Sequence, residues 1–280
     1  MPELPEIEAW RRALDDPVSA FPIVKAGPAH VATLKTFDPP LSTLEGRRLA
    51  GAERRAKRLL FPTEDGELVV LLHLMTAGRL KYLKAGEAGP KTPAFQLAFE
   101  GGARLVLTEA GAKKRAGVWL LNPEEAKQEL AHLGPEALGL GEERLAEICV
   151  DESRRLHSML RDQRVIAGIG RSWVDEILWE AGLSPFKQGS ELEDEEVDRL
   201  HAALHVLGDA IDRYEQVIGD QVPDKLPMPL KVHRRQGEPC PRCGATLAAV
   251  HFAEHVTTYC PEEQTGGRVL KDRRLSRLLK

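Results

Sequence analysis

The sequence predicts an α+β protein of several domains: a leading helix and a β-sandwich, then an α-helical domain, then a small cysteine-bearing β-hairpin. Short β-rich runs separated by Gly, Pro and charged turns fill residues 21–121. From Asn122 the apolar residues instead recur with a helical period. Three of the four cysteines, Cys240, Cys243 and Cys260, lie in the C-terminal region, which favours a metal site over a secreted disulfide framework.

The N-terminal domain is expected to span residues 1–121 and to begin with a short helix. Its later runs have the alternating pattern of half-buried strands, and a sandwich is the arrangement that such short strands favour. The expected strands are His30–Phe37, Leu59–Phe61, Leu68–Met75, Phe95–Phe99, Arg104–Thr108 and Val118–Leu121.

An α-helical domain is expected over residues 122–220. Asn122 is a suitable N-cap, and Pro123 suits the first helical position. Residues 221–230 (QVPDKLPMPL) contain three prolines and no helical period, which predicts a stiff linker before a terminal module over residues 231–280. The expected helical segments are 143–149, 153–160, 173–181 and 194–217.

Composition excludes a membrane protein. The 280 residues are 42% hydrophobic and 29% charged, and no run reaches the roughly eighteen apolar residues of a spanning helix. The opening MPELPEIEAW carries acids where a secretion signal needs basic residues and an apolar block. We therefore expect a cytoplasmic protein without a membrane partner, associated with the nucleoid if its source is bacterial.

The net charge of −4 hides a segregated distribution. Residues 47–58 hold six Lys/Arg against one Glu, residues 113–115 are Lys-Lys-Arg, and residues 231–280 hold ten Lys/Arg against five acids. The compensating acids gather in residues 191–198. Basic runs are usually solvated surfaces, so they indicate a polyanion partner only beside a recognisable nucleic-acid-binding element.

The N-terminus carries the most informative local chemistry. Removal of Met1 would expose Pro2 as a secondary amine, and a free α-amino group with a pKa of about 8 is partly unprotonated and nucleophilic at neutral pH. Glu3 and Glu6 fall on the first helical turn, where carboxylates can transfer protons or stabilise a positive intermediate. The alternative is that this segment is only a well-capped helix start.

The C-terminal cysteines have the spacing of metal ligands. Two residues separate the first pair, sixteen separate the second, and Glu263 stands where a four-cysteine ribbon would have its last thiolate. A carboxylate binds zinc less strongly than a thiolate does, and His251 or His255 could also supply a ligand. One structural zinc is expected, with a metal-free hairpin as the alternative. The predicted ligands are Cys240, Cys243, Cys260 and Glu263.

Several motifs together resemble those of the formamidopyrimidine-DNA glycosylase/endonuclease VIII (Fpg/Nei) family. The opening MPELPEIEAWRRAL is similar to the start of the Fpg form. Further stretches follow in the family order over nearly the whole chain. These are AKRLL at 56–60, HLMTAGRL at 73–80, LGPEAL at 133–138, the helix-two-turn-helix stretch LRDQRVIAGIG at 160–170, and the cysteine module at 240–260.

The resemblance implies a DNA glycosylase with AP lyase activity, an enzyme of base excision repair that flips a damaged base out of DNA. Pro2 would attack the sugar C1′ and form a Schiff base, and the strand would then be cleaved by β- or β,δ-elimination. Glu3 corresponds to the acid that protonates the sugar ring oxygen, and Glu6 to its supporting carboxylate. Lys57 would contact the phosphate beside the lesion or the leaving group. The implied partner is damaged DNA, single-stranded, forked or duplex, bound by a monomer.

The resemblance also implies DNA contacts outside the catalytic residues. Gly168 and Gly170 let backbone N–H groups approach a phosphate at the start of the following helix. Arg171 stands where the family usually has Asn, and His255 stands where its hairpin has Arg, so both contacts are expected to differ in geometry. The residues implied to contact DNA are His73, Arg115, Gly170, Arg171 and His255.

Two departures concern the residues that fill the gap left by a flipped base. The family's Met position falls on Thr76, one residue after Met75, and its Arg-Phe pair falls on Arg115-Ala116. Alanine cannot hold bases apart as a Phe wedge does. The segment before Lys231 is also short for a loop that caps 8-oxoguanine. The expected substrate is therefore single-stranded, distorted or crosslinked DNA, as in the vertebrate Nei-like branch, and not an 8-oxoguanine duplex.

Two other functions are left open by the residues alone. One is a catalytically silent DNA-binding relative, against which Pro2, Glu3 and Lys57 together argue. The other is an RNA- or ribosome-binding ribbon protein, which has no need of an N-terminal proline.

Overall fold

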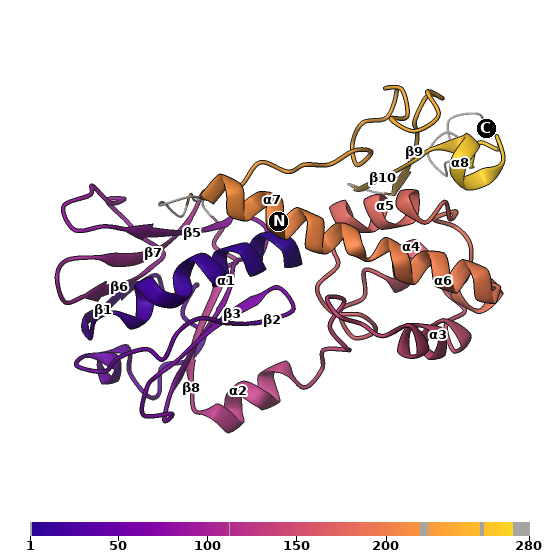
Figure 1. The fold of residues 1–280 in the computed structure, drawn as a ribbon. Coiled ribbons are helices and arrows are strands. Elements are labelled where there is room, and N and C mark those ends of the chain that lie inside the picture. The colour runs from indigo at the N-terminus through magenta and orange to yellow at the C-terminus, as the bar shows by residue number, and fades with distance from the viewer. Residues whose placement is uncertain (1, 112, 219–222, 224, 253–254, 271–280) are drawn as a thin grey trace. The chain divides into compact units, whose positions relative to one another are not determined.

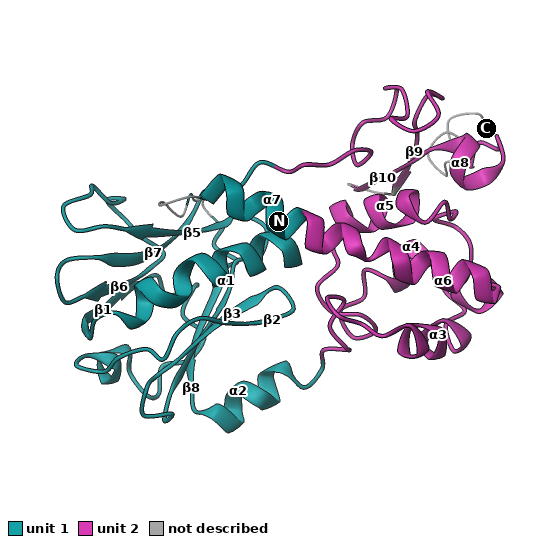
Figure 2. Ribbon diagram, in the orientation of Figure 1, with its two compact units in different colours: residues 1–132, 210–227 teal, residues 133–209, 228–280 magenta. Residues whose placement is uncertain are grey.

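The computed structural model describes every residue except 1, 112, 219–222, 224, 253–254 and 271–280 (Figure 1). The chain divides into two compact units, coloured separately in Figure 2. Unit 1 comprises residues 1–132 and 210–227, and unit 2 comprises residues 133–209 and 228–280. The domain boundaries expected from the sequence stay predictions.

Unit 1 begins with helix α1 (Leu4–Ser19), which confirms the expected leading helix. Glu3 is its N-cap, and Pro5 suits the first turn because its fixed φ is already helical. The helix packs against strands β2 and β3, defined below, with a fully buried apolar face. The residues of that face recur every three or four positions, as one side of a helix requires. They are Leu4, Ile7, Trp10, Leu14 and Val18.

Two four-stranded sheets, antiparallel throughout, follow α1. A 3₁₀ turn, η1 (Leu41–Leu44), precedes β2. Phe61, Phe95 and Phe99 of these strands are almost completely buried, as expected of a sandwich core. In sheet order, the first sheet is β1 (Ile23–Ala29), β6 (Phe95–Phe99), β7 (Arg104–Glu109) and β5 (Gly78–Leu83). The second is β2 (Glu53–Arg55), β3 (Arg58–Pro62), β4 (Val69–His73) and β8 (Gly117–Leu121).

The strand expected at His30–Phe37 is wrong. The strand β1 lies before it, and the N–H groups of Thr33 and Leu34 both donate to the carbonyl of His30, which closes a turn. Apolar residues in this segment, such as Phe37 (66% exposed), point to solvent, so their alternation did not reflect burial. Strands β2 and β5 were not expected, because charged residues interrupt their apolar pattern.

After β8, helix α2 (Pro123–Leu130) starts at the expected N-cap, where the Asn122 side chain accepts the Glu125 N–H at 2.9 Å. Unit 2 is helical, as expected. The segment expected as one helix over 194–217 is interrupted at Leu204, which is the C-cap of the first of two helices. The elements are α3 (Glu142–Val150), α4 (Leu156–Met159), α5 (Arg171–Glu180), η2 (Gly189–Glu191), α6 (Asp194–Ala203) and α7 (His205–Ile218). From Ala210 onward, α7 belongs to unit 1.

The C-terminal module of unit 2 contains the hairpin β9 (Ala248–Phe252) and β10 (His255–Tyr259), followed by the short helix α8 (Pro261–Thr265). The module's apolar residues cluster with Trp179 of α5. The Glu176 carboxylate of α5 accepts the backbone N–H groups of residues 231–233 at 2.8–2.9 Å. The expected fold class, α+β with a sandwich, a helical domain and a terminal hairpin, is thereby confirmed. No helix within the described residues is long and apolar enough to cross a membrane.

Candidate functional site

The N-terminus of α1 brings two carboxylates together in a buried place. Pro2 is buried, and Glu3 and Glu6 are 2% and 4% exposed. Their spacing forms a capping box, in which the Glu3 side chain accepts the Glu6 N–H and the Glu3 N–H donates to Glu6 Oε2 at 3.1 Å. The sequence therefore folds this turn in a way that places two acids directly beside Pro2.

Burial and the neighbouring Glu3 charge raise the pKa of Glu6 to about 7, because both disfavour its ionised form. The second oxygen of Glu6, Oε1, lies 3.3 Å from the hydroxyl of Tyr214 in the unit 1 part of α7. Burial and the nearby carboxylates of Glu6 and Glu3 raise the pKa of Tyr214, so it stays a neutral donor. Glu6 is thus partly protonated at neutral pH, a state suited to proton exchange.

Lys57 lies in the turn of the β2–β3 hairpin, next to Ala56, whose φ is +53°. The lysine is 7% exposed. Arg54 of β2 ties this hairpin to α1, because its Nε lies 2.8 Å from Glu8 Oε2 and both side chains are buried. The N-terminal acids and Lys57 therefore lie on two elements, α1 and the β2–β3 hairpin, that pack against each other.

His73 ends β4, where it pairs with Arg58 of β3. Burial and the positive charges of Arg58 and Lys57 lower the pKa of His73 to about 3. The imidazole is therefore neutral at physiological pH, and it can contact a phosphate as a hydrogen-bond donor and not as a charge.

The β7–β8 loop presents Arg115 to solvent. The buried Glu109 carboxylate accepts the N–H groups of Arg115 at 2.9 Å and Ala116 at 3.0 Å, which fixes the backbone where the arginine emerges. Ala116 is completely buried and does not project. In the β4–β5 turn Thr76 is exposed, and Met75 before it has a φ of +52°, an unusual conformation for a non-glycine residue.

Unit 2 brings together three of the residues expected to contact DNA, Gly170, Arg171 and His255. Gly170 is the N-cap of α5, and Arg171 Nη2 lies 2.5 Å from His255 Nε2 of β10. A guanidinium only donates, so Nε2 of the imidazole accepts and Nδ1 carries the proton. Nδ1 is shielded from solvent and, among the described residues, has no hydrogen-bond partner. The exposed guanidinium of Arg171 is therefore the group of this pair that an oxyanion can reach.

The side chain of Gln163 fixes the backbone of the loop before α5. Gln163 Nε2 donates to the Ile169 carbonyl at 2.7 Å, and its Oε1 accepts the Gly168 N–H at 3.0 Å. Gly168 has a φ of +110°, which an L side chain rarely adopts. The backbone conformation therefore requires a glycine in this turn, and of the first residues of α5 the exposed one is Arg171.

Three thiols form a candidate metal centre in the terminal module. The sulfur atoms of Cys240, Cys243 and Cys260 lie within 4.8 Å of one another, and the last two are 3.4 Å apart. Zinc bound to thiolates at about 2.3 Å in a tetrahedron requires sulfur separations of this order, so the cluster fits a structural zinc site. Such an ion would cross-link the segment around Cys240 to the end of β10.

Glu263, the expected fourth ligand, is not part of this cluster among the described residues. Its Oε2 lies 3.4 Å from Arg242 Nη1, and its place in the zinc site stays a prediction. The indole of Trp179 donates to Cys240 Sγ at 3.4 Å. Burial disfavours the Cys240 thiolate, but the N–H groups of Cys243, Arg242 and Trp179 outweigh it and lower the Cys240 pKa to about 7. These donors therefore favour the thiolate form of Cys240, the form in which a cysteine binds a metal ion.

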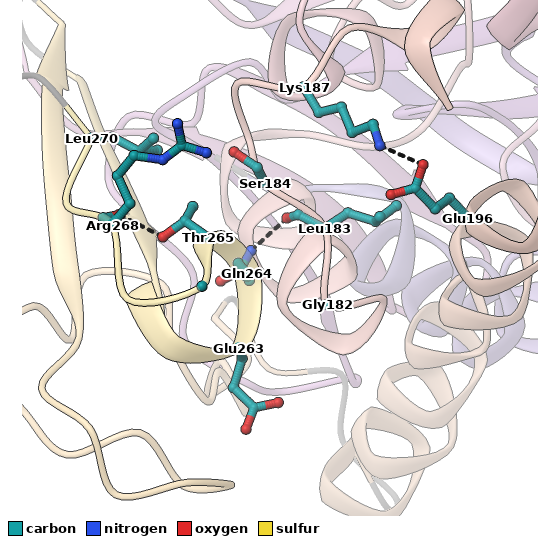
Figure 3. A pocket seen from close by; sticks show the side chains of 11 residues that line it. Gly182, Leu183, Ser184, Lys187, Glu196, Glu263, Gln264, Thr265, Arg268 and Leu270 are labelled. Carbon is teal, nitrogen blue, oxygen red and sulfur yellow. Dashed lines mark hydrogen bonds and ion pairs between the residues drawn. The ribbon is translucent and has the colours of Figure 1, made fainter. Parts of the chain in front are cut away.

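A separate pocket lies in unit 2, between the segment after α5, helix α6 and the end of α8 (Figure 3). Lys187 there pairs with Glu196 at 2.5 Å, and the buried Gln264 side chain joins the Leu183 carbonyl to the Cys260 N–H. None of the predicted catalytic residues lines this pocket. It is therefore not the candidate active site.

Two residues of the site, Tyr214 and Glu109, were missed by the sequence analysis. Tyr214 continues the buried helical face of Leu207, Ala210 and Ile211. A hydroxyl on such a face must find a partner, and that was the available signal. Glu109 gave no such signal, because an acid at the end of a strand is ordinarily solvated.

Three family models match the chain in order. They are the formamidopyrimidine-DNA glycosylase N-terminal domain over residues 1–116, the formamidopyrimidine-DNA glycosylase H2TH domain over residues 133–221, and the zinc finger found in FPG and IleRS over residues 237–262. The three models therefore cover both units and the terminal module.

Relatives and solved structures agree with these matches. Formamidopyrimidine-DNA glycosylase of Salmonella paratyphi B is 30% identical over 271 residues, which cover 93% of this chain and 98% of the relative. A formamidopyrimidine-DNA glycosylase-like protein of Mycobacterium tuberculosis is 42% identical over 149 residues, 53% of this chain and 94% of the relative. The complex of Lactococcus lactis Fpg with DNA containing an abasic site has the same fold, with a TM-score of 0.84 at 24% identity, covering 94% of this chain and 100% of that chain.

Proposed function

Because the chain belongs to the formamidopyrimidine-DNA glycosylase family, we propose that it excises a damaged base from DNA through Pro2 and then cleaves the strand at the resulting abasic site. It is a DNA glycosylase with AP lyase activity, an enzyme of base excision repair, and its partner is damaged DNA. The observation that carries the mechanism is the buried pair of carboxylates at the start of α1, of which Glu6 has a pKa of about 7.

The nucleophile is the secondary amine of Pro2, free once Met1 is removed; Met1 lies outside the described residues. Its nitrogen forms a bond to the sugar C1′ while the glycosidic bond breaks and the base leaves with its electron pair. Glu3 protonates the sugar ring oxygen, so the ring opens and an iminium remains. This positive imine then accepts electrons as a proton leaves C2′ and the 3′ phosphate departs.

Glu6 removes the proton that Pro2 must lose after attack. A base with a pKa of about 7 accepts a proton and also returns it near neutral pH, which a carboxylate of ordinary pKa does poorly. Burial of both acids supports this role, because protons then exchange among fixed groups and not with bulk water.

The positive and neutral donors of unit 1 bind the strand beside the lesion. Lys57 contacts the phosphate next to the damaged nucleotide, and the neutral His73 donates to a neighbouring phosphate oxygen. The Arg115 side chain is exposed, and the Glu109 carboxylate fixes its backbone. An arginine held in this way is suited to contact DNA on the opposite side of the flipped nucleotide.

In unit 2 the backbone N–H groups at Gly170 and the Arg171–His255 pair bind a DNA phosphate. In this pair the guanidinium is that of Arg171 at the start of α5, and the neutral group is the imidazole of His255 in the hairpin. Zinc, when bound, cross-links the hairpin, and the cysteines thereby keep His255 against Arg171.

The preferred substrate is single-stranded, bubble or crosslinked DNA. Ala116 is completely buried, so no side chain from this position can enter the gap left by a flipped base. Thr76 is exposed but short. An enzyme without a large wedge gains most from DNA that is already unstacked. The short segment before Lys231 also motivated this preference. Its residues 219–222 and 224 lie outside the described residues.

The proposed function is tested by following base release and strand scission together on one oligonucleotide that carries a ring-opened purine. The wild-type protein should release the free base, detected by mass spectrometry, and cut the strand at the same position. Glu124→Gln, a change of an exposed acid on α2, serves as the control that should behave as wild type. Strand scission without release of a base, or neither reaction on any lesion, would contradict the proposal.

A further inference from the structure

Tyr214 is a buried titratable residue that the proposed mechanism does not use. It lies in the part of α7 that belongs to unit 1, it is 1% exposed, and its hydroxyl is 3.3 Å from Glu6 Oε1. Its neighbours Arg213 and Glu215 are exposed, so the helix presents only this residue to the interior at that turn. Tyr214 thus reaches an N-terminal acid from 208 positions along the chain.

Two contacts fix this part of the chain against α1 on the C-terminal side of the tyrosine. Arg12 Nη1 of α1 lies 2.8 Å from Glu215 Oε1, and the indole of Trp10 donates to the Pro223 carbonyl at 3.1 Å. Trp10 is 1% exposed. Packing of the two segments therefore determines where the Tyr214 hydroxyl lies, and its bond to Glu6 does not have to hold the helix in place.

The hydrogen bonds of Glu6 give its two oxygens different roles. Oε2 accepts the backbone N–H of Glu3, and an amide N–H can only donate. A proton arriving at Glu6 is therefore favoured on Oε1, where it faces Tyr214, because a protonated oxygen accepts the Glu3 N–H less well. A hydroxyl can donate to the ionised carboxylate and accept from the protonated acid, so Tyr214 satisfies Oε1 in both states.

We propose that Tyr214 is a positioning residue that holds Glu6 Oε1 as the proton-exchanging oxygen and favours its ionised form, an inference that rests on the proposed role of Glu6. The hydroxyl stays on the enzyme and forms no bond to DNA. Its contribution is to keep the Glu6 carboxylate in one orientation while the proton moves from the Pro2 amine to Oε1 and back.

The charged groups around Glu6 determine the sign of the effect. Glu3 on the same turn repels the ionised form, and burial disfavours it further, whereas the Tyr214 hydrogen bond and the backbone N–H groups favour it. Other charged groups lie on or against α1: Lys57 of the β2–β3 hairpin, and the acids Asp15 and Asp16 further along the helix. Glu8 is compensated by Arg11, Arg12 and Arg54, and Glu215 of α7 pairs with Arg12. Removal of the hydroxyl therefore takes away a stabilising bond to the carboxylate, and the pKa of Glu6 rises.

The test compares Tyr214→Phe with Tyr82→Phe in the pH dependence of kcat/KM for base excision. Tyr82 is a matched control, because its hydroxyl also bonds to α1, at the Pro17 carbonyl (3.1 Å), far along the helix from Glu6. The ascending limb of the kcat/KM profile should move to higher pH by about 0.5 unit or more in Tyr214→Phe only. At pH values above this limb, kcat/KM should stay within about twofold of wild type. An unmoved limb, or an equal loss at every pH, overturns the inference.

A second measurement separates this inference from the proposed function. The Glu6 carboxyl carbon is titrated by ¹³C NMR in the free protein, and Glu6→Gln identifies its signal. The midpoint should rise in Tyr214→Phe and stay unchanged in Tyr82→Phe. A shifted midpoint in a protein without glycosylase activity would support the contact and overturn the proposed function, whereas an unshifted midpoint overturns the contact whatever the activity.

A third variant covers the case in which Tyr214→Phe does not fold. The chain has three tyrosines, so 3-fluorotyrosine incorporated into a Tyr82→Phe/Tyr259→Phe background labels Tyr214 alone. Fluorination makes the hydroxyl a stronger donor, and the Glu6 midpoint should then fall, opposite to the effect of phenylalanine. A midpoint that rises or does not move overturns the inference.

Discussion

The N-terminus of α1 in unit 1 and the start of α5 in unit 2 hold their functional side chains in different ways. Glu3 and Glu6 are nearly inaccessible and are bonded to the backbone of their own turn. Arg171 is exposed and is held by His255, a residue 84 positions away. The difference follows from the proposed tasks. Proton transfer requires fixed groups shielded from water, whereas a phosphate must be able to reach the charge that binds it.

The two regions also differ in how closely they keep the family pattern. By the resemblance drawn from the sequence, the proline, the acids and Lys57 in unit 1 are expected to match it, whereas Arg171, His255 and Glu263 in unit 2 are expected to depart from it. A phosphate accepts hydrogen bonds from many donors, so a guanidinium can come from either member of a contacting pair. The chemistry at C1′ allows no such exchange. Changes of the acids at the start of α1 should therefore alter the chemical step, and changes at the start of α5 should alter binding.

The largest expected effect comes from Glu3→Gln. Loss of the acid should slow base excision about 10²- to 10⁴-fold, the usual contribution of a general acid, while affinity for abasic-site DNA stays within about threefold of wild type. Single-turnover excision and fluorescence anisotropy measure the two quantities. Glu124→Gln is the exposed control. A parallel loss of affinity would show that chemistry and binding are not separated between the two units.

The second effect concerns Arg171. Arg171→Asn should weaken DNA binding on the order of tenfold and lower the slope of log affinity against log salt by about one, with little change in the single-turnover rate at saturating enzyme. Arg144→Asn, at an exposed position on α3, is the matched control.

The double variant Arg171→Asn/His255→Arg sharpens this test, because it returns the guanidinium to the hairpin. It should bind DNA within about threefold of wild type if the pair acts as one phosphate contact. Equal affinities of the double variant and Arg171→Asn would show that the two side chains do not share a task.

The third effect concerns the missing wedge at Ala116 and Thr76, a departure from the family pattern that lies in unit 1 and affects which DNA is bound. The wild-type protein should excise one lesion on the order of tenfold faster from single-stranded or bubble DNA than from duplex at fixed salt. Ala116→Phe would overpack a site with no free surface, so a wedge is better added as Thr76→Met at the exposed turn. Thr76→Met should excise the lesion faster than wild type from duplex DNA only. Ser190→Met, at an exposed position of unit 2, is the control and should excise at the wild-type rate. An 8-oxoguanine:cytosine duplex as the best substrate would contradict the expectation.

The smallest effect concerns the metal. Protein purified without a His-tag should contain about one zinc per chain, and Glu263→Cys should slow its release to a chelator about threefold or more, because a thiolate replaces a weaker ligand. Glu262→Cys, one residue away, is the control. Equal release rates in the two variants would remove Glu263 from the zinc site, and the absence of zinc with full DNA affinity would indicate a metal-free hairpin.

Local features of this chain could be predicted from the sequence, and long-range contacts could not. The Glu3–Glu6 capping box and the Asn122 N-cap depend on residues three apart, so their spacing is visible in the sequence. The Tyr214–Glu6 contact depends on how two distant segments pack. The same limit explains the false strand at 30–37, since its alternating pattern could not show that no neighbouring strand pairs with it along its length.

The most direct measurement of the central claim is borohydride trapping on an oligonucleotide with an abasic site, followed by mass analysis of the adduct. Protein confirmed to lack Met1 should form a covalent complex, and peptide mapping should place the oligonucleotide on Pro2. Pro5→Ala, which leaves the N-terminal amine intact, should trap equally well. Trapping on Lys57 or another lysine, or no adduct with the Met-free protein, would contradict the account.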